Sequence, residues 1–418
     1  MTTKETGFWR YENRMIAVLC LMFGVVFFDR NAMSNLAVFV QRDLALSNFE
    51  ITLLVAGLSC AWAIAALLIG AISDRTGSRK GLLVITVVAF SLCSVFSGVA
   101  TGFAVLLVSR ILMGFSEGGI LPIAQSMVAL ESDEKRRGFN MGVMQNAGSN
   151  LIGSFLAPIV LTAIALAWGW RSAFFAAAIP GLICAALIWF FVREPKTHEI
   201  AARVATPAAG DKMGMASMLR YRNIWLCALI SILMVPWMII GWVFLQLYLI
   251  NVRGVSETDA SYVAGVLGIS AFVFAFIVPG LSDRIGRKPV TIGFTLLGAL
   301  YPIFTLYFNG PLWMLGILIF IAWSASAVFP LFMATVPSET IPARYVATSM
   351  GLVMGLGELI GGTSLIPLAG AAADKWGLQA PMWIAVVLAL VSAFLALFLQ
   401  ETAPVKVGAA HLAMARAA

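Results

Sequence analysis

Long apolar runs alternate with short polar breaks along almost the whole chain. Runs of about 20 residues or more recur between Met15 and Leu399, and each is long enough to cross about 30 Å of hydrocarbon as an α-helix. The runs are continuously apolar and do not alternate with a period of two, which argues against a β-barrel. Cutting the chain at charged or turn-rich breaks predicts twelve spans, near residues 15–39, 50–73, 81–101, 103–129, 139–166, 171–192, 223–250, 260–281, 289–308, 312–336, 345–370 and 378–400.

The composition agrees with a polytopic, all-α membrane protein. Of the 418 residues, 61% are apolar and 11% are charged, whereas soluble domains have about 45–50% apolar and about 25% charged residues. A soluble enzyme, a disordered chain and a secreted scaffold are therefore excluded. The five cysteines lie within apolar runs without CxxC spacing, so we expect neither a disulfide framework nor a metal site.

Basic residues are distributed unevenly between the two sets of connections. With alternate connections grouped together, one set carries 21 Lys and Arg residues and the other carries 4. Because positive loops stay in the cytoplasm, both termini and the central connection are predicted to be cytoplasmic. The net charge of +7 is thus explained by topology, and we expect no nucleic-acid partner. The N-terminus has no cleavable-signal pattern, so the first run is retained as a helix.

The second half of the chain repeats the first. The segment GAISDRTGSRK from Gly70 returns as GLSDRIGRK from Gly280, and further matches recur at a spacing of 208 or 209 residues. We therefore expect two parallel six-helix repeats, with a substrate site between them near the membrane midplane. The predicted domains are an N-terminal bundle over residues 1–193, a mobile cytoplasmic linker over 194–222 and a C-terminal bundle over 223–418.

These motifs resemble those of the major facilitator superfamily. The pattern G-x-x-x-D-R-x-G-x-R-K between the second and third spans is similar to its signature loop, and Arg110-Ile-Leu-Met-Gly114 resembles its second motif, R-x-x-x-G. Phe28-Asp29-Arg30, with Arg110 and Glu117-Gly118-Gly119, resembles the anion:cation symporter group. That group includes organic-acid and sugar-acid permeases and the vesicular glutamate and sialic acid carriers.

The signature loop occurs once in each repeat. Its glycines permit a tight turn, and its aspartate can pair with arginines or cap a helix. The resemblance implies that these loops hold the two halves together while the site faces outward. Alternatively, Arg75, Arg79 and Lys80 serve only as topology anchors. The gating residues predicted on this basis are Gly70, Asp74, Arg75, Gly77, Asp283, Arg284 and Gly286.

Five ionisable residues lie deep in the predicted spans: Asp29, Arg30, Arg110, Glu117 and Glu358. Each costs about 2.5–3.5 kcal/mol to insert into a bilayer, so such groups face a cavity or one another. Adjacent helical residues point about 100° apart. We therefore expect Arg30 to line the cavity and Asp29 to turn toward Arg110.

An arginine in a cavity of low dielectric constant matches both oxygens of a carboxylate. Arg30 is the predicted ligand of an anionic substrate, and an ion pair with Asp29 or Glu117 is the structural alternative. The resemblance implies a packing and coupling role for Arg110, although direct anion contact is also considered. A carboxyl group that loses its arginine to an arriving anion gains affinity for a proton. Asp29 and Glu117 are the candidates, because neither histidine lies in a span.

Glu358 departs from the subgroup, where a polar uncharged residue is usual. It is a candidate third proton site, a ligand for a positively charged part of the substrate, or a structural partner. Polar residues on the fifth span form a stripe, which is either a substrate wall or a source of interhelical bonds. Aromatic residues on the seventh and tenth spans either pack or line the site. The predicted lining comprises Gln145, Asn146, Ser149, Trp242, Gln246 and Trp323.

Together these features predict proton-coupled uptake of a small organic anion across a bacterial-type inner membrane by alternating access. No GxxxxGK[ST] motif for nucleotide binding occurs, and no cofactor is expected besides the coupling proton. We expect a monomer. The alternative within transport is proton-driven efflux of drugs or metabolites. A membrane enzyme is disfavoured because no catalytic cluster adjoins a span, and a receptor is disfavoured because neither tail is long enough for a signalling domain.

Overall fold

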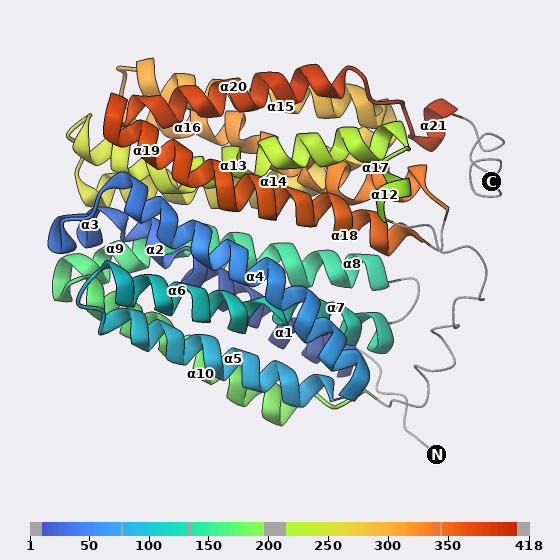
Figure 1. The fold of residues 1–418 in the computed structure, drawn as a ribbon, viewed down its shortest axis with the longest axis horizontal. Coiled ribbons are helices and arrows are strands. Elements are labelled where there is room, and N and C mark those ends of the chain that lie inside the picture. The colour runs from blue at the N-terminus through green and yellow to red at the C-terminus, as the bar shows by residue number, and fades with distance from the viewer. Residues whose placement is uncertain (1–10, 77, 133–135, 196–214, 343–344, 408–418) are drawn as a thin grey trace. The chain divides into compact units, whose positions relative to one another are not determined.

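The computed structural model describes residues 11–76, 78–132, 136–195, 215–342 and 345–407 (Figure 1). These residues are helical apart from short connections, and no β-strand occurs among them. The chain divides into two compact units. The first unit comprises Met1–Leu46 and Gly57–Ala205, and the second comprises Ser47–Ala56 and Thr206–Ala418.

The first unit contains α-helices and two adjoining π-helical segments. Its elements are α1 (Tyr11–Arg30), α2 (Ala32–Asn35), α3 (Ala37–Leu44), α4 (Asn48–Thr76, whose first residues up to Ala56 belong to the second unit), α5 (Arg79–Gly98), α6 (Phe103–Gly118), α7 (Ile120–Glu131), α8 (Arg137–Gly142), η1 (Val143–Ala147), η2 (Ser149–Leu156), α9 (Ala157–Trp168) and α10 (Trp170–Phe191).

Over its described residues, the second unit contains α-helices, one 3₁₀-helical segment (η3) and two π-helical segments (η4 and η6). They are α12 (Met215–Met218), α13 (Arg222–Asn251), α14 (Glu257–Ile285), α15 (Arg287–Tyr307), α16 (Leu312–Ala322), η3 (Trp323–Val328), η4 (Leu331–Thr335), α17 (Val336–Thr340), α18 (Val346–Leu356), η6 (Gly357–Leu365), α19 (Ile366–Trp376), α20 (Gln379–Ala396) and α21 (Pro404–Val407).

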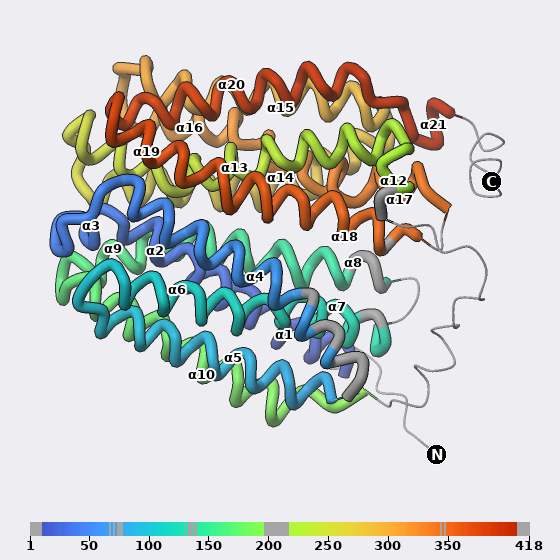
Figure 2. Tube along the Cα trace, viewed as in Figure 1, coloured from blue at the N-terminus to red at the C-terminus, as the bar shows by residue number. Residues whose placement is uncertain are grey.

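Twelve helical stretches in the described residues are long and apolar enough to span a membrane, which confirms the predicted number. The first predicted span, 15–39, is not one straight helix. It passes through α1, α2 and α3, with breaks at Asn31 and Leu36, and its path can be followed in Figure 2. The Asn31 side chain donates to the carbonyl of Gly153 at 2.9 Å. Helix α1 thus ends next to Asn31, whose side chain is hydrogen-bonded to the backbone of η2.

In the first unit, α1 packs against η1, η2 and α10, and α5 packs against α6 and α10. The core is apolar, with Leu19, Phe90 and Met113 fully buried. Gly148 lets η2 approach α1 closely, since a Cβ atom there would collide with the carbonyl oxygen of Cys20. Large apolar side chains such as Ile85 are exposed, as expected for a surface that faces lipid.

In the second unit, α13 packs against α20 and η6, and α15 packs against α20 and η3. Gly357 and Gly361 lie one turn apart on η6. A Cβ atom on Gly361 would lie 2.5 Å from the carbonyl oxygen of Ile232 on α13. Small residues at this spacing allow two membrane helices to pack closely.

Helix α10 ends at Phe191 and α13 begins at Arg222, close to the predicted bundle boundaries at residues 193 and 223. Two features differ from the predicted domain plan. Residues Ser47–Ala56 cluster with the second unit, and Met215–Met218 within the predicted linker is helical. Residues 196–214 of that linker lie outside the described part of the chain.

Candidate functional site

Three charged side chains are buried in the first unit at the level where α1, α5 and α6 meet. Asp29 and Arg110 are fully buried, and Glu117 is 1% exposed. Asp29 lies on α1, while Arg110 and Glu117 lie two turns apart on α6. Asp29 Oδ1 accepts a hydrogen bond from Ser94 Oγ at 2.7 Å, and Arg110 Nη2 donates to Ser97 Oγ at 2.7 Å. Both serines belong to α5, so this helix contacts both an acid and a base.

Several atoms of this charged cluster (Asp29, Arg110 and Glu117) have no hydrogen-bond partner. They are Asp29 Oδ2, Arg110 Nε and Nη1, and both carboxylate oxygens of Glu117. Within the described residues, Asp29 and Arg110 interact electrostatically but form no ion pair. Buried polar atoms without partners are costly. The arrangement is therefore suited to groups that gain a proton or another partner during a functional cycle.

Asp29 and Arg30 diverge, as helical geometry predicts. Arg30 is partly exposed, and its guanidinium lies over the ring of Trp62 on α4, with its central carbon 5.1 Å from the ring centroid. The same carbon of Arg30 lies 5.9 Å from the centroid of the Phe27 ring. Arg30 also interacts electrostatically with Glu117. It forms no ion pair or hydrogen bond with any residue that the structure describes, so its N–H groups are available to an anion.

The predicted polar stripe of the fifth span falls on the π-helical segments η1 and η2. Gln145, Asn146 and Asn150 are partly exposed, whereas Ser149 is buried and donates to the Gln145 carbonyl. Gln145 also accepts from the Gln125 amide at 3.4 Å. A π-helix has a wider turn than an α-helix and often occurs at functional sites. The amides of Asn146 and Asn150 remain candidates for substrate contact.

The predicted site residues of the second unit differ in accessibility. Trp323 is fully buried and stacks on Trp237, with 4.7 Å between ring centroids. Gln246 is 2% exposed. Trp242 and Glu358 are partly buried, and Trp242 Nε1 has no hydrogen-bond partner. Trp242 and Glu358 are thus better placed than Trp323 to meet a ligand, and the binding role of each stays a prediction.

The two units differ at equivalent positions. At the repeat spacing of 208 residues, Trp237 corresponds to Asp29 and Trp323 corresponds to Phe115. Trp237 donates its indole N–H to the carbonyl of Gly298 at 3.1 Å and so is satisfied within the second unit. At the same spacing Arg110 corresponds to Leu318 and Glu117 corresponds to Ala325. The charged cluster of the first unit thus has no charged counterpart at these positions, which makes the first unit the better candidate for proton chemistry.

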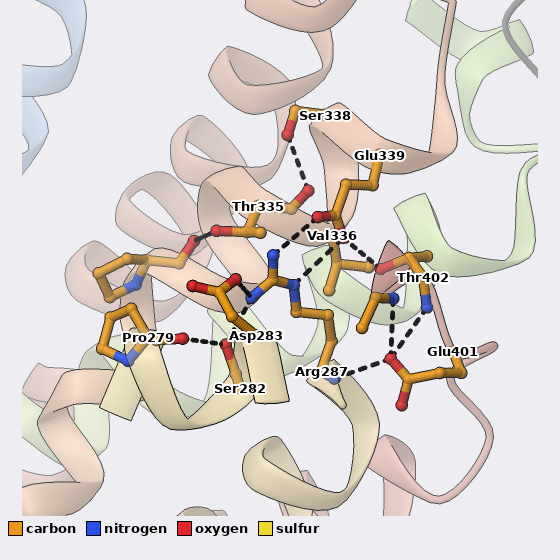
Figure 3. Close-up of polar contacts among 12 residues, drawn as sticks. Pro279, Ser282, Asp283, Arg287, Thr335, Val336, Ser338, Glu339, Glu401 and Thr402 are labelled. Carbon is orange, nitrogen blue, oxygen red and sulfur yellow. Dashed lines mark hydrogen bonds and ion pairs between the residues drawn. The ribbon is translucent and has the colours of Figure 1, made fainter. Parts of the chain in front are cut away.

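The predicted gating motif of the second unit takes part in a network of charges (Figure 3). Arg287 Nη2 lies 2.9 Å from Glu339 Oε1, and Arg287 Nη1 lies 2.5 Å from Asp283 Oδ1. Thr402 donates to Glu339 at 2.6 Å. The Glu401 carboxylate accepts from the backbone N–H of Arg287 at 2.7 Å and so caps α15. The predicted residue Asp283 thus joins a larger network that connects α14, α15, α17 and the segment before α21.

The tight turn predicted at Gly286 is confirmed by its backbone φ of +115°, which favours glycine. Arg284 is exposed. In the first unit, Gly70 lies on α4, whereas Gly77 and the side chains of Asp74 and Arg75 lie outside the described part of the structure.

Sequence reasoning missed the two glutamates that cap the helices after the gating loops. Glu194 accepts from the backbone N–H groups of Arg79 at 2.6 Å and Lys80 at 2.9 Å, as Glu401 does at the start of α15. The two glutamates are 207 residues apart, so extending the repeat comparison past the sixth and twelfth spans would have found them. Ser94 and Ser97 were also missed, and serine in an apolar span gives no such signal.

Within the described residues, no cluster of three or more His, Cys, Asp or Glu side chains could hold a metal ion. The twelve spans, the glutamate caps repeated in the two units and the charged cluster in the first unit are the features of a membrane transporter. The chain belongs to the Major Facilitator Superfamily, whose sequence profile matches residues 19–365.

Two relatives and one solved structure illustrate what the chain is similar to. The chain is 30% identical over 289 residues to a hexuronate transporter of Bacillus subtilis, covering 68% of each protein. It is 28% identical over 271 residues to the multidrug resistance protein MdtG of Proteus mirabilis, covering 63% of this chain and 64% of the relative. The crystal structure of a D-xylose-proton symporter has the same fold, with a TM-score of 0.75, 18% identity and coverage of 94% of this chain and 99% of that one.

Proposed function

We propose that the chain is a secondary active transporter that takes up a small organic anion, a carboxylate, together with protons by alternating access. The observation that carries this proposal is Arg30. Its guanidinium is held by two aromatic rings and not by a carboxylate. Its electrostatic interaction with Glu117 supplies no hydrogen-bonded partner. A cation in a membrane span that forms no ion pair is costly, and a substrate carboxylate would supply that pairing. The likeness to a hexuronate transporter supports an anionic substrate.

Proton coupling is assigned to Asp29 and Glu117. Glu117 is buried and neither of its oxygens accepts a hydrogen bond. An ionised carboxylate in such surroundings depends on nearby positive charge, and Arg30 and Arg110 supply that charge. An anion that engages Arg30 would weaken its interaction with Glu117 and favour protonation of that carboxyl. Substrate and proton would thereby bind cooperatively.

We assign Arg110 the role of a coupling residue, because its guanidinium is fully buried and bonded to α5. In the first unit, Gln145, Asn146 and Ser149 of the fifth span are proposed to contact the substrate. In the second unit, the same role is proposed for Trp242 and Gln246 of the seventh span, while Trp323 packs on Trp237. The chain is proposed to act in a bacterial-type inner membrane with both termini in the cytoplasm, as the distribution of basic residues indicates.

Two measurements on purified protein test the proposal. A thermal-shift screen against carboxylates, including galacturonate, gluconate, benzoate and succinate, should identify anions that raise the melting temperature. Uptake of the best anion into proteoliposomes should then exceed equilibrium when the outside is acidic, and the excess should collapse with a protonophore. Accumulation without a proton gradient, or no stabilisation by any carboxylate, would contradict the proposal.

The alternative is proton-driven efflux of drugs or metabolites, which the likeness to a multidrug resistance protein supports. An exporter of cations would use Asp29, Glu117 and Glu358 without needing Arg30. In the same proteoliposomes, an antiporter would accumulate an organic cation such as ethidium when the inside, and not the outside, is acidic. The direction of the effective gradient therefore distinguishes the two functions.

A further inference from the structure

Ser94 on α5 has two possible acceptors for its single hydroxyl hydrogen. Its Oγ lies 2.7 Å from Asp29 Oδ1 and 3.1 Å from the carbonyl oxygen of Phe174 on α10. When Asp29 is ionised, the hydroxyl can donate to the carboxylate. When Asp29 is protonated, the carboxyl can donate to Ser94 Oγ, and Ser94 can donate to Phe174 instead. Both protonation states of Asp29 therefore have a complete local hydrogen bond.

Ser97, one turn further along α5, contacts the positively charged partner of the cluster, Arg110. Its Oγ accepts from Arg110 Nη2 at 2.7 Å, and its own hydrogen is donated to the Cys93 carbonyl at 2.9 Å or shared with Ser109 at 3.0 Å. The guanidinium of Arg110 also lies over the ring of Phe174, 4.9 Å from its centroid. Ser97 and Phe174 together hold the arginine on the α5 and α10 side.

We infer that Ser94 and Ser97 are positioning residues that keep Asp29 and Arg110 close but unpaired, so that Asp29 can exchange a proton without breaking a buried ion pair. A closed ion pair between buried groups is expensive to break. Here Asp29 Oδ2 and Arg110 Nε and Nη1 are left without partners. The separation would keep Asp29 exchangeable at a modest energetic cost. This inference rests on the proposed proton coupling and extends it to residues of α5.

Few other charged or titratable groups act on Asp29. Among the described residues they are Arg110 and Glu117 on α6 and Cys93 on α5, besides the adjacent Arg30. Helix α10 contributes the carbonyl of Phe174, which Ser94 contacts. The arginine of that helix, Arg171, is paired with Asp43 instead. Changing either serine should therefore act mainly on the balance between Asp29 and Arg110.

The two serines predict opposite effects on the titration of Asp29. Ser94→Ala removes a donor to the carboxylate and disfavours the ionised form, so the midpoint should move to higher pH. Ser97→Ala releases Arg110, which can then reach the unpartnered Oδ2 of Asp29 and favour the ionised form, so the midpoint should move to lower pH. We expect about one pH unit in each direction, which is a tenfold change in proton affinity.

Ser91 provides a matched control. It lies one turn before Ser94 on α5, it is also fully buried, and its hydroxyl donates to the Val87 carbonyl of its own helix. Ser91→Ala should leave the midpoint unchanged. Ser94→Thr keeps the hydroxyl group and should return the midpoint to that of the unmodified protein, which separates loss of the hydrogen bond from loss of packing.

The measurement is a pH titration of the full-length protein by infrared difference spectroscopy in lipid without any substrate. The carboxyl C=O band of Asp29 is identified by its loss in Asp29→Asn. Opposite shifts for Ser94→Ala and Ser97→Ala, with no shift for Ser91→Ala, support the inference. Shifts in the same direction, shifts equal to the control, or no titration of Asp29 overturn it. Because no substrate is used, failure here is distinct from failure of anion transport.

Discussion

Arg30 and Trp62 form a cation–π contact across α1 and α4 in the first unit, with 5.1 Å between the guanidinium carbon and the ring centroid. An aromatic face attracts the positive charge without neutralising it and leaves the edge of the guanidinium open. We therefore expect Trp62 to orient Arg30 for the proposed carboxylate substrate and to oppose its collapse onto Glu117.

Trp62→Leu should weaken anion binding. Such contacts contribute about 0.5–2 kcal/mol, so affinity for a stabilising carboxylate should fall by roughly twofold to thirtyfold. Trp62→Phe keeps an aromatic face, so its loss of affinity should be smaller. Isothermal titration of both variants measures this, and equal losses in the two would show that the ring face does not position Arg30.

Arg30→Ala should abolish carboxylate binding, because no other group replaces its charge. Arg30→Lys keeps the charge but not the planar two-point geometry, and it should bind at least tenfold more weakly. Lys375→Ala, a change at an exposed basic residue of α19, is the control. The thermal-shift response to the carboxylate identified by the screen distinguishes them, and a response retained in Arg30→Ala would remove Arg30 from the site.

Glu117→Gln should separate exchange from accumulation. The amide has nearly the shape of the acid but cannot carry a proton, so substrate can still cross while the proton gradient no longer drives it. Counterflow of the labelled carboxylate identified by the screen should persist in part, and uphill uptake driven by an acidic exterior should stop. Unchanged uphill uptake would mean that Glu117 takes no part in coupling.

The charge network of Figure 3 predicts unequal effects from its two acids. The side chain of Glu339 is 15% exposed and that of Asp283 is 62% exposed, while both contact Arg287, which is 8% exposed. Glu339→Ala leaves a buried charge poorly paired and should destabilise the protein by about 3–5 kcal/mol. Asp283→Ala removes an exposed pair and should cost about 1 kcal/mol or less. Thermal unfolding in detergent compares them, and equal losses would contradict the assignment.

The number and approximate limits of the spans could be predicted because hydrocarbon demands long apolar helices. The break of the first span at Asn31 could not, since it depends on a hydrogen bond to Gly153 of another helix. Nor could the π-helical turns of η1, η2 and η6. Changes in helix type arise from packing, which hydrophobic periodicity does not record.

The same contrast applies to the site. Charged residues are conspicuous in apolar spans because their insertion into a bilayer costs free energy. Asp29, Arg30, Arg110 and Glu117 could therefore be identified from the sequence. Their hydrogen-bond partners Ser94 and Ser97 could not, because serine is common in membrane helices and only the fold shows which serine meets a charge. The full burial of Trp323 was likewise not evident, since its stacking on Trp237 joins helices that are distant in the sequence.

The most direct test of the central claim records proton and substrate fluxes together. Proteoliposomes are loaded with a pH-sensitive dye and placed at equal pH inside and outside, and an inward gradient of the carboxylate identified by the thermal-shift screen is then applied. The account predicts acidification of the interior that follows labelled uptake and disappears in Arg30→Ala. Uptake at the normal rate without acidification, or acidification that persists in Arg30→Ala, would contradict it.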